Sequence, residues 1–171
     1  MEIEYRLATE KDINTLVDFY NDIVDYQTYD EYGACWTKDI YPCKADLENH
    51  IKNNKFYLGY LNNVLVCAGA LQLHEDSIYS EVNFKIKENV GVIHLIAVSK
   101  DYRHQGISKE FVNYIINQAK PYVKAIHLDV ITSNLRACRL YESCGFKYIE
   151  TKEVFYEDTG NISANLYEYI Y

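Results

Sequence analysis

The sequence predicts an α/β protein: a mixed, twisted, mostly antiparallel sheet of about seven strands, with helices on both faces. Seven short apolar segments have strand character, and four segments carry apolar residues at helical spacing. Candidate antiparallel hairpins lie early and late in the chain, with strand–helix units between them. Because the 171 residues contain no internal repeat and no linker, we expect one domain covering residues 1–171.

Local signals set the bounds of the expected elements. Thr9 offers an N-cap for the first helix, and Asp12 follows three residues later, close to a capping box. Asn62-Asn63 separates two apolar segments with a pair that tolerates positive φ, which predicts a hairpin. Pro121 ends the third helix and Gly145 the fourth. In chain order the expected elements are strand 3–7, helix 13–24, helix 46–52, strands 56–61 and 64–73, strand 91–98, helix 107–119, strand 125–130, helix 134–143, and a closing hairpin of 146–155 with 164–171.

The composition is that of a globular protein, with 49% hydrophobic and 25% charged residues. No apolar run reaches the roughly 18–20 residues of a membrane span, and the charged N-terminus lacks a signal-peptide core. We therefore expect a cytoplasmic protein that does not bind membranes. The five cysteines are odd in number and show neither a CxxC pair nor zinc-ligand spacing, so we expect free thiols and no metal.

Charge is unevenly distributed along the chain. The net charge of -8 disfavours binding to nucleic acid or to anionic membranes. Residues 100–139, however, contain seven basic and three acidic residues, a net of +4 that leaves -12 for the rest. This distribution suits an anionic ligand in the basic segment and a cationic ligand elsewhere. Solvated helix faces explain it equally well.

The apolar segment 91–98 runs into a glycine-containing loop at the start of a predicted helix. A helix N-terminus offers unpaired backbone N–H groups and positive partial charge, which together can hold a diphosphate. Gly106 lets a ligand approach the backbone closely, and Arg103, His104 and Lys109 add basic groups. Taken alone, Arg-x-x-Gly is also compatible with an ordinary strand-to-helix turn.

In its setting the loop resembles the acetyl-CoA motif of the GNAT superfamily, which has Arg or Gln, two residues, Gly, one residue, and then Gly or Ala. The chain reads Arg103-His104-Gln105-Gly106-Ile107-Ser108, so Ser108 departs from the pattern and bears on cofactor affinity. The segment 134–146 resembles the family's Asn-x-x-Ala…Leu-Tyr-x-x-x-Gly-Phe at every one of those positions. The resemblance implies a GNAT-like sheet that splays at its central parallel strands, and acetyl-CoA (CoA) as the cofactor.

The resemblance also implies roles for individual residues. Backbone groups of Ile96 and Val98 are expected to pair with the pantetheine arm like an added strand, and Asn134 to contact the same arm. Tyr141 is expected to act as the general acid that protonates the departing sulfur, although a core tyrosine is the alternative in a chain with 18 tyrosines. The full set of expected cofactor-binding residues is Ile96, Ala97, Val98, Arg103, His104, Gln105, Gly106, Ile107, Ser108, Lys109, Asn134, Ala137 and Tyr141.

A direct attack on the thioester requires a neutral amine, so an ammonium acceptor must first lose a proton. His94 is the leading candidate base, because strand alternation places it on one face with Ile96 and Val98. The arylalkylamine acetyltransferases of the superfamily carry a histidine at the equivalent position and a second one two residues earlier, where this chain has Val92. A buried structural histidine, Glu81 as the base, and a chain of water molecules are the alternatives.

Residues 26–41 interleave aromatic and acidic side chains, a combination that suits a cationic amine, although an exposed loop anchored by its aromatics is the alternative. Within it, Gly33 to Trp36 and Tyr41-Pro42 resemble a stretch found in bacterial members of the superfamily. The expected acceptor-binding residues are Tyr26, Tyr29, Trp36 and Glu81.

The predicted function is transfer of an acetyl group from acetyl-CoA to a primary amine of a small molecule, such as a polyamine, an amino acid or an amino-sugar derivative. A protein N-terminus or a lysine side chain is an alternative acceptor. Outside catalysis, the alternatives are an acyl-CoA-binding module that senses cofactor and a purely structural domain. Many members of the superfamily form homodimers, but no feature of this sequence requires one.

Overall fold

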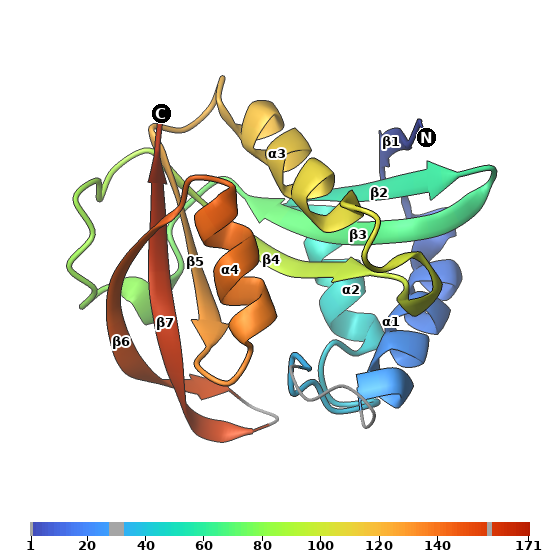
Figure 1. Ribbon diagram of the computed structural model, residues 1–171, viewed down its shortest axis with the longest axis horizontal. Coiled ribbons are helices and arrows are strands. Elements are labelled where there is room, and N and C mark those ends of the chain that lie inside the picture. The colour runs from blue at the N-terminus through green and yellow to red at the C-terminus, as the bar shows by residue number, and fades with distance from the viewer. Residues whose placement is uncertain (1, 28–32, 157–158) are drawn as a thin grey trace.

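The computed structural model describes residues 2–27, 33–156 and 159–171, which contain one seven-stranded sheet flanked by helices (Figure 1). The strands are β1 (Glu4–Leu7), β2 (Lys55–Leu61), β3 (Val64–Gln72), β4 (Val90–Val98), β5 (Ala125–Ile131), β6 (Lys147–Tyr156) and β7 (Gly160–Ile170). The α-helices are α1 (Ile13–Gln27), α2 (Lys44–Asn53), α3 (Ile107–Ala119) and α4 (Leu135–Ser143), and the short 3-10 helices are η1 (Glu10–Asp12), η2 (Ser77–Tyr79) and η3 (Lys100–Tyr102).

The strand order is β1-β2-β3-β4-β5-β7-β6, and every neighbouring pair except β4–β5 is antiparallel. This confirms the expected mixed, mostly antiparallel sheet. Two bounds differ from the expectation by more than two residues. Strand β7 begins at Gly160, because this residue already pairs with Tyr156 of β6. Helix α1 continues to Gln27, so Tyr26 belongs to its last turn and not to the loop that follows.

Helices α3 and α4 cover one face of the sheet, and α1 and α2 cover the other (Figure 1). On the first face, Phe111 and Ile115 of α3 are fully buried against the strands. On the second, Leu16 of α1 and Leu47 of α2 are equally inaccessible. Each such side chain contributes about 1.5–3 kcal/mol when it leaves water, so the two amphipathic helix pairs hold the sheet between them. No helix among the described residues has both the length and the apolar character to cross a bilayer.

The start of α1 is fixed by the expected capping interaction. Asp12 Oδ2 accepts hydrogen bonds from the backbone N–H and the hydroxyl of Thr9, at 2.8 and 3.0 Å. Arg6 of β1 reaches the same carboxylate with both terminal nitrogens, at 2.6 and 2.9 Å. These donors stabilise the carboxylate, chiefly through Arg6, and lower the pKa of Asp12 to about 2 although its burial acts in the opposite direction.

The sheet splays in the middle, as the resemblance implied. Strands β4 and β5 pair only at their first three residues, from Val90 with Ala125 to Val92 with His127. Beyond Val92 the two strands diverge (Figure 1), and no β-ladder partner on the β5 side is found for the rest of β4 among the described residues. The divergence leaves a gap in the sheet that is bordered by Ile96 and Val98.

A β-bulge interrupts β4 at the same place. Ala70 of β3 pairs with His94, whereas Ala68 pairs with Ala97, so β4 has one residue more than β3 between these pairs. Leu95 adopts a φ of 57°, and its carbonyl accepts a hydrogen bond of 2.6 Å from the buried hydroxyl of Tyr20. Tyr20 thereby anchors the bulge to α1.

The bulge changes which face His94 occupies. His94 follows Ala70 and Ala97 on the face covered by α1 and α2, and its ring lies against α2. Ile96 and Val98 instead pack against the core under α3 and α4. The expectation that His94 shares a face with Ile96 and Val98 is therefore wrong, because the extra residue reverses the alternation between positions 94 and 96.

Candidate active site

Two adjoining cavities lie where β4 and β5 separate. The first has a volume of about 300 Å³ and reaches from the splayed end of β4 to the start of α3. The second has a volume of about 560 Å³ and lies between α2, β4, β5 and the end of β6. We call them the cradle cavity and the acceptor cavity. Both are lined by Ala34, Trp36, Ile96, Asn134 and Ala137, so each opens onto the same part of the gap in the sheet.

The N-terminus of α3 forms one end of the cradle cavity. Gly106 is its N-cap and has a φ of 80°, a left-handed conformation that favours glycine. The first helical N–H that finds a carbonyl is that of Glu110, which donates to Gly106 O at 3.1 Å, so the N–H groups of the preceding turn have no acceptor in the helix. A Cβ added to Gly106 would meet no atom within 4 Å, which leaves open space in front of the turn. These features fit a diphosphate.

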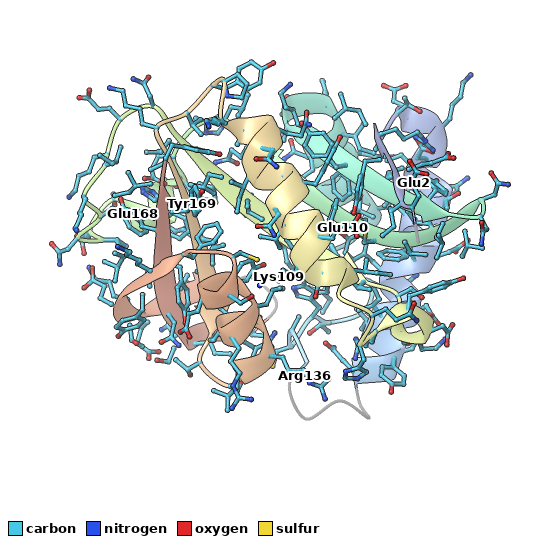
Figure 2. All side chains as sticks on the ribbon, turned by 45° about the horizontal axis from the view of Figure 1, so that its top comes forward. Glu2, Lys109, Glu110, Arg136, Glu168 and Tyr169 are labelled. Atoms are coloured by element: carbon cyan, nitrogen blue, oxygen red, sulfur yellow. The ribbon has the colours of Figure 1, made fainter. Side chains whose placement is uncertain are left out.

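Most of the expected cofactor-binding residues line this cavity, namely Ile96, Ala97, Val98, Arg103, His104, Gly106, Ile107, Ser108, Asn134 and Ala137. Gln105, Lys109 and Tyr141 do not line it. The guanidinium of Arg103 lies 5.0 Å from the ring centre of Tyr26. Arg136 of α4 lines the cavity although sequence reasoning missed it, and its position next to the Asn134 cap was the available signal. Figure 2 shows Arg136 and Lys109 on the face of the sheet that carries α3 and α4.

Helix α4 brings its first two turns to the junction of the cavities. The side-chain oxygen of Asn134 caps the helix by accepting from Ala137 N–H at 3.1 Å. The amide nitrogen of Asn134 is thus the donor that remains for a ligand. Tyr141 lies one turn beyond Ala137, is 8% exposed and lines the acceptor cavity. Burial, and secondarily the charge of Asp129, raise the pKa of the Tyr141 phenol well above its ordinary value, so the hydroxyl keeps its proton.

His94 lines the acceptor cavity from β4. Its Nε2 atom is buried and has no hydrogen-bond partner among the described residues. Burial lowers the pKa of His94, against the smaller raising effects of Asp129 and Asp76. The imidazole is therefore neutral near pH 7 and able to accept a proton.

His50 is a second imidazole in this cavity that sequence reasoning missed. It lies on α2, and its ring centre is 5.3 Å from that of His94. Asn54 Nδ2 donates to Nδ1 of His50 at 2.8 Å, which places the ring proton on Nε2. Burial first, and then the nearby His94, lower the pKa of His50 to about 4, although Asp46 and Asp76 act to raise it.

The expected acceptor-binding residues do not all line the cavities. Trp36 lines both cavities and packs edge-on against Tyr20 with ring centres 5.6 Å apart. Tyr26 lines neither cavity and covers Arg103 instead. Glu81 is exposed and also lies outside both linings. Tyr29 falls outside the described residues. Sequence reasoning missed the wall contributed by Asp46, Asn49, Asp76, Ile78, Asp129, Phe155 and Tyr156.

The cysteines differ in exposure, and one of them, Cys35, is exposed and lines the acceptor cavity. All five cysteines are free, and Cys138 and Cys144 of α4 are 7% and 8% exposed. Burial raises the pKa of the Cys144 thiol, which disfavours the thiolate that a nucleophile needs. Within the described part of the chain, no three His, Cys, Asp or Glu side chains are grouped as metal ligands.

The chain belongs to the acetyltransferase (GNAT) family, whose sequence profile matches residues 25–146. Enzymes of this family use acetyl-CoA as the acetyl donor. The matched range contains the splayed strand, the start of α3 and the whole of α4. It includes both cavities except for Ile23 at the cradle cavity and Phe155, Tyr156 and Thr159 at the acceptor cavity.

Two curated relatives are named as N-acetyltransferases, and one of them is named for a ribosomal protein. The N-alpha-acetyltransferase 60 of Xenopus tropicalis is 27% identical over 145 residues, which are 82% of this chain and 59% of that protein. The [Ribosomal protein bS18]-alanine N-acetyltransferase of Escherichia coli K12 is 35% identical over 65 residues, which are 37% of this chain and 44% of that protein. The chain thus spans only about half the length of these relatives.

Solved structures share the fold over nearly the whole chain. A GNAT-family acetyltransferase of Streptococcus agalactiae superposes with a TM-score of 0.81 at 18% identity, covering 99% of this chain and 95% of that one. The ribosomal-protein-S18-alanine N-acetyltransferase of Escherichia coli superposes with a TM-score of 0.70 at 18% identity, covering 99% and 94%. The yncA protein of Salmonella typhimurium, solved with acetyl-CoA, has a TM-score of 0.70 at 12% identity, covering 99% and 94%.

Proposed function

We propose that this protein transfers the acetyl group of acetyl-CoA to a primary amine of a small molecule. The observation that carries the proposal is the meeting of two cavities at the gap in the sheet. One has a helix N-terminus suited to a diphosphate, and the other contains a protonated phenol and a neutral imidazole. The acceptor cavity, at about 560 Å³, falls in the range of roughly 300–1,000 Å³ that small-molecule sites occupy.

Bound acetyl-CoA would supply the activated thioester. The N-terminal turn of α3 would hold its diphosphate, with Arg103 and Arg136 nearby as counter-charges. Backbone groups along Ile96 to Val98, unpaired on the β5 side, would hold the pantetheine arm as an added strand. Asn134 would donate to the same arm through its amide nitrogen.

Three proton movements would accompany the reaction. An ammonium acceptor would lose a proton to Nε2 of His94, and the resulting neutral amine would form the new C–N bond as the C–S bond breaks. Tyr141 would donate its phenolic proton to the departing sulfur, and the second proton that the attacking nitrogen loses as the amide forms would restore the Tyr141 hydroxyl. His50 lies beside His94 and presents Nε2–H, so it can take part in moving the first proton toward solvent.

A protein acceptor is the second candidate. It is favoured by the names of the two relatives, an N-alpha-acetyltransferase and a [Ribosomal protein bS18]-alanine N-acetyltransferase. The walls that α2, β6 and the segments 34–41 and 72–78 contribute to the acceptor cavity favour the small molecule, because a peptide needs an open groove along which its chain can leave.

Replacement of Tyr141 by Phe tests the proposal directly. We expect acetyl transfer, followed as thiol release across a panel of primary amines and N-terminal peptides, to fall by about 10²–10⁴-fold. The affinity for acetyl-CoA, measured by calorimetry, should remain within about twofold, because Tyr141 lines the acceptor cavity and not the cradle cavity. Tight cofactor binding with no transfer by the unsubstituted protein to any amine would instead establish a non-catalytic acyl-CoA-binding module.

A further inference from the structure

As far as the structure describes the chain, the acceptor cavity is lined by acidic side chains and by no strongly basic one. Three aspartates line it: Asp46 from α2, Asp76 at the start of η2, and Asp129 from β5. Among the described residues that line it there is neither Lys nor Arg. All three aspartates are partly exposed, and Asp46 and Asp76 each accept one backbone hydrogen bond, from Cys43 N–H at 2.8 Å and from Ile78 N–H at 3.1 Å, which leaves acceptor capacity for a cation. Asp129 is compensated in part, because the hydroxyls of Tyr79 and Tyr156 donate to its two oxygens.

The three carboxylates come from different elements of the cavity wall: Asp129 from β5, Asp76 from the N-cap of η2 and Asp46 from the first turn of α2. Asp129 and Asp76 affect the pKa of His94, whereas Asp46 and Asp76 affect the pKa of His50. Asp129 therefore belongs with His94 and Tyr141 at the reacting end, and Asp46 belongs to the wall formed by α2.

A second and independent feature points to a ligand in the same space. Nε2 of His94 is buried and unpartnered among the described residues, and a buried polar atom is rarely left so unless something else bonds it. Aromatic side chains, among them Trp36 and Phe155, line the cavity around it. Phe155 is 66% exposed, so its ring is available to a ligand. Aromatic faces and carboxylates together attract alkylammonium groups.

We propose that the acceptor is a small dicationic amine, with the reacting amine at His94 and Tyr141 and a second ammonium held between Asp76 and Asp46. The proposal rests on the acetyl-transfer function given above and narrows its substrate class. An acceptor with a carboxylate next to the amine, such as an α-amino acid, would meet three aspartates and no described basic lining residue. An amino sugar with a single amine would leave Asp46 and Asp76 without a counter-charge.

The test is a matched acceptor series with acetyl-CoA, read as kcat/KM by thiol release and by mass of the product. Each α,ω-diamine of three to six carbons is paired with the monoamine of equal length and with the corresponding ω-amino acid. The diamine should exceed its monoamine by about 10-fold or more, as expected for a charge-assisted hydrogen bond, and the amino acid should be the poorest.

Asp46→Asn is the discriminating variant, because the amide oxygen can still accept from Cys43 N–H at the start of α2, where Asp46 Oδ2 now accepts at 2.8 Å. It should remove most of the diamine preference and change the monoamine rate less than about threefold. Glu48→Gln on the same helix, which is exposed and lines neither cavity, is the control and should keep the full preference.

The possible outcomes distinguish the dicationic acceptor from the acetyl-transfer function on which that proposal rests. Acetylation of monoamines or amino acids as fast as of diamines would overturn the dicationic acceptor and leave small-molecule acetyl transfer standing. Transfer to N-terminal peptides alone would overturn both. A diamine preference that survives in Asp46→Asn would contradict the assignment of Asp46.

Discussion

Single residues in this protein are held in protonation states that fit their proposed roles. Tyr141 and His94 are both shifted by burial, and the same cause has opposite signs: it raises the pKa of a phenol and lowers that of an imidazole. The acid therefore stays protonated and the base stays neutral at the same pH. Burial alone is enough for both protonation states, so neither requires an ion pair. Tyr141 lies on helix α4 and His94 on the splayed strand β4.

The state of His50 is open to direct measurement. Its folded-state pKa of about 4 lies below the ordinary 6.5, so the unfolded chain binds a proton more readily than the folded one between these values. The stability that this residue contributes is present above about pH 6.5 and is lost as the pH falls toward 4. We expect the carbon-bound ring proton of His50 to show no NMR titration above about pH 5. His94→Asn should raise the midpoint, and a normal midpoint in the unsubstituted protein would contradict the buried pair.

The carboxylate of Asp12 allows a second test of a lowered pKa, at a more acidic pH. Its folded-state pKa of about 2 lies below the ordinary 3.8, so its stabilisation is present above about pH 4 and lost as the pH falls toward 2. We expect Asp12→Ala to lower the free energy of unfolding at pH 7 by about 2–3 kcal/mol, because donors from Arg6 and Thr9 lose a charged acceptor. Urea unfolding at pH 7 and pH 3 measures this. An equal effect at both pH values would contradict the assignment.

At the scale of elements, the start of α3 and the bulge in β4 differ in how much the sequence reveals. Residues Arg103 to Ser108 carry their structure locally: a glycine with positive φ directly precedes the first turn of a helix. The bulge leaves no such trace, because Leu95 is an ordinary strand residue and its positive φ is imposed by β3 and by the bond from Tyr20. Strand alternation therefore assigned His94 to the wrong face.

The contribution of Gly106 to cofactor binding can be measured separately from the effect of its positive φ on stability. Gly106 and Gly160 both have positive φ, 80° and 73°, and a Cβ on either would meet no atom within 4 Å. Alanine at either position should therefore cost a similar amount of stability, about 1 kcal/mol. Only Gly106→Ala should also weaken binding of CoA in calorimetry, by about 10-fold or more, because its methyl group would occupy the space of the diphosphate. Equal CoA affinity in the two variants would argue against the cradle.

At the scale of the whole molecule, the sequence predicted the sheet, its splay and the cofactor side of the site better than the acceptor side. The order of strands and helices and the two motifs are each encoded by residues that are close together in the sequence. The acceptor cavity is assembled from positions far apart in the chain, such as His50, Asp76 and Asp129, which only the tertiary fold brings together. Glu81 was a reasonable choice by charge, but the fold leaves it on the surface.

The uneven distribution of charge along the chain corresponds to the positions of the two cavities in the fold. The segment with net positive charge contains the N-terminus of α3 and all of α4, which border the cradle cavity. The acidic side chains of the acceptor cavity come mainly from outside that segment, with Asp129 as the exception. The two cavities thus present opposite electrostatic environments to an anionic donor and a cationic acceptor, while sharing a wall at Ile96 and Ala137.

The most direct test of acetyl transfer is mass spectrometry of a reaction that contains the protein, acetyl-CoA and a short diamine, with thiol release measured in parallel. We predict one N-acetylated product for each thiol released, at a rate that saturates with both substrates and falls by about 10²–10⁴-fold in Tyr141→Phe. Thiol release without an acetylated amine, or an acetylated product formed equally fast by Tyr141→Phe, would contradict the account.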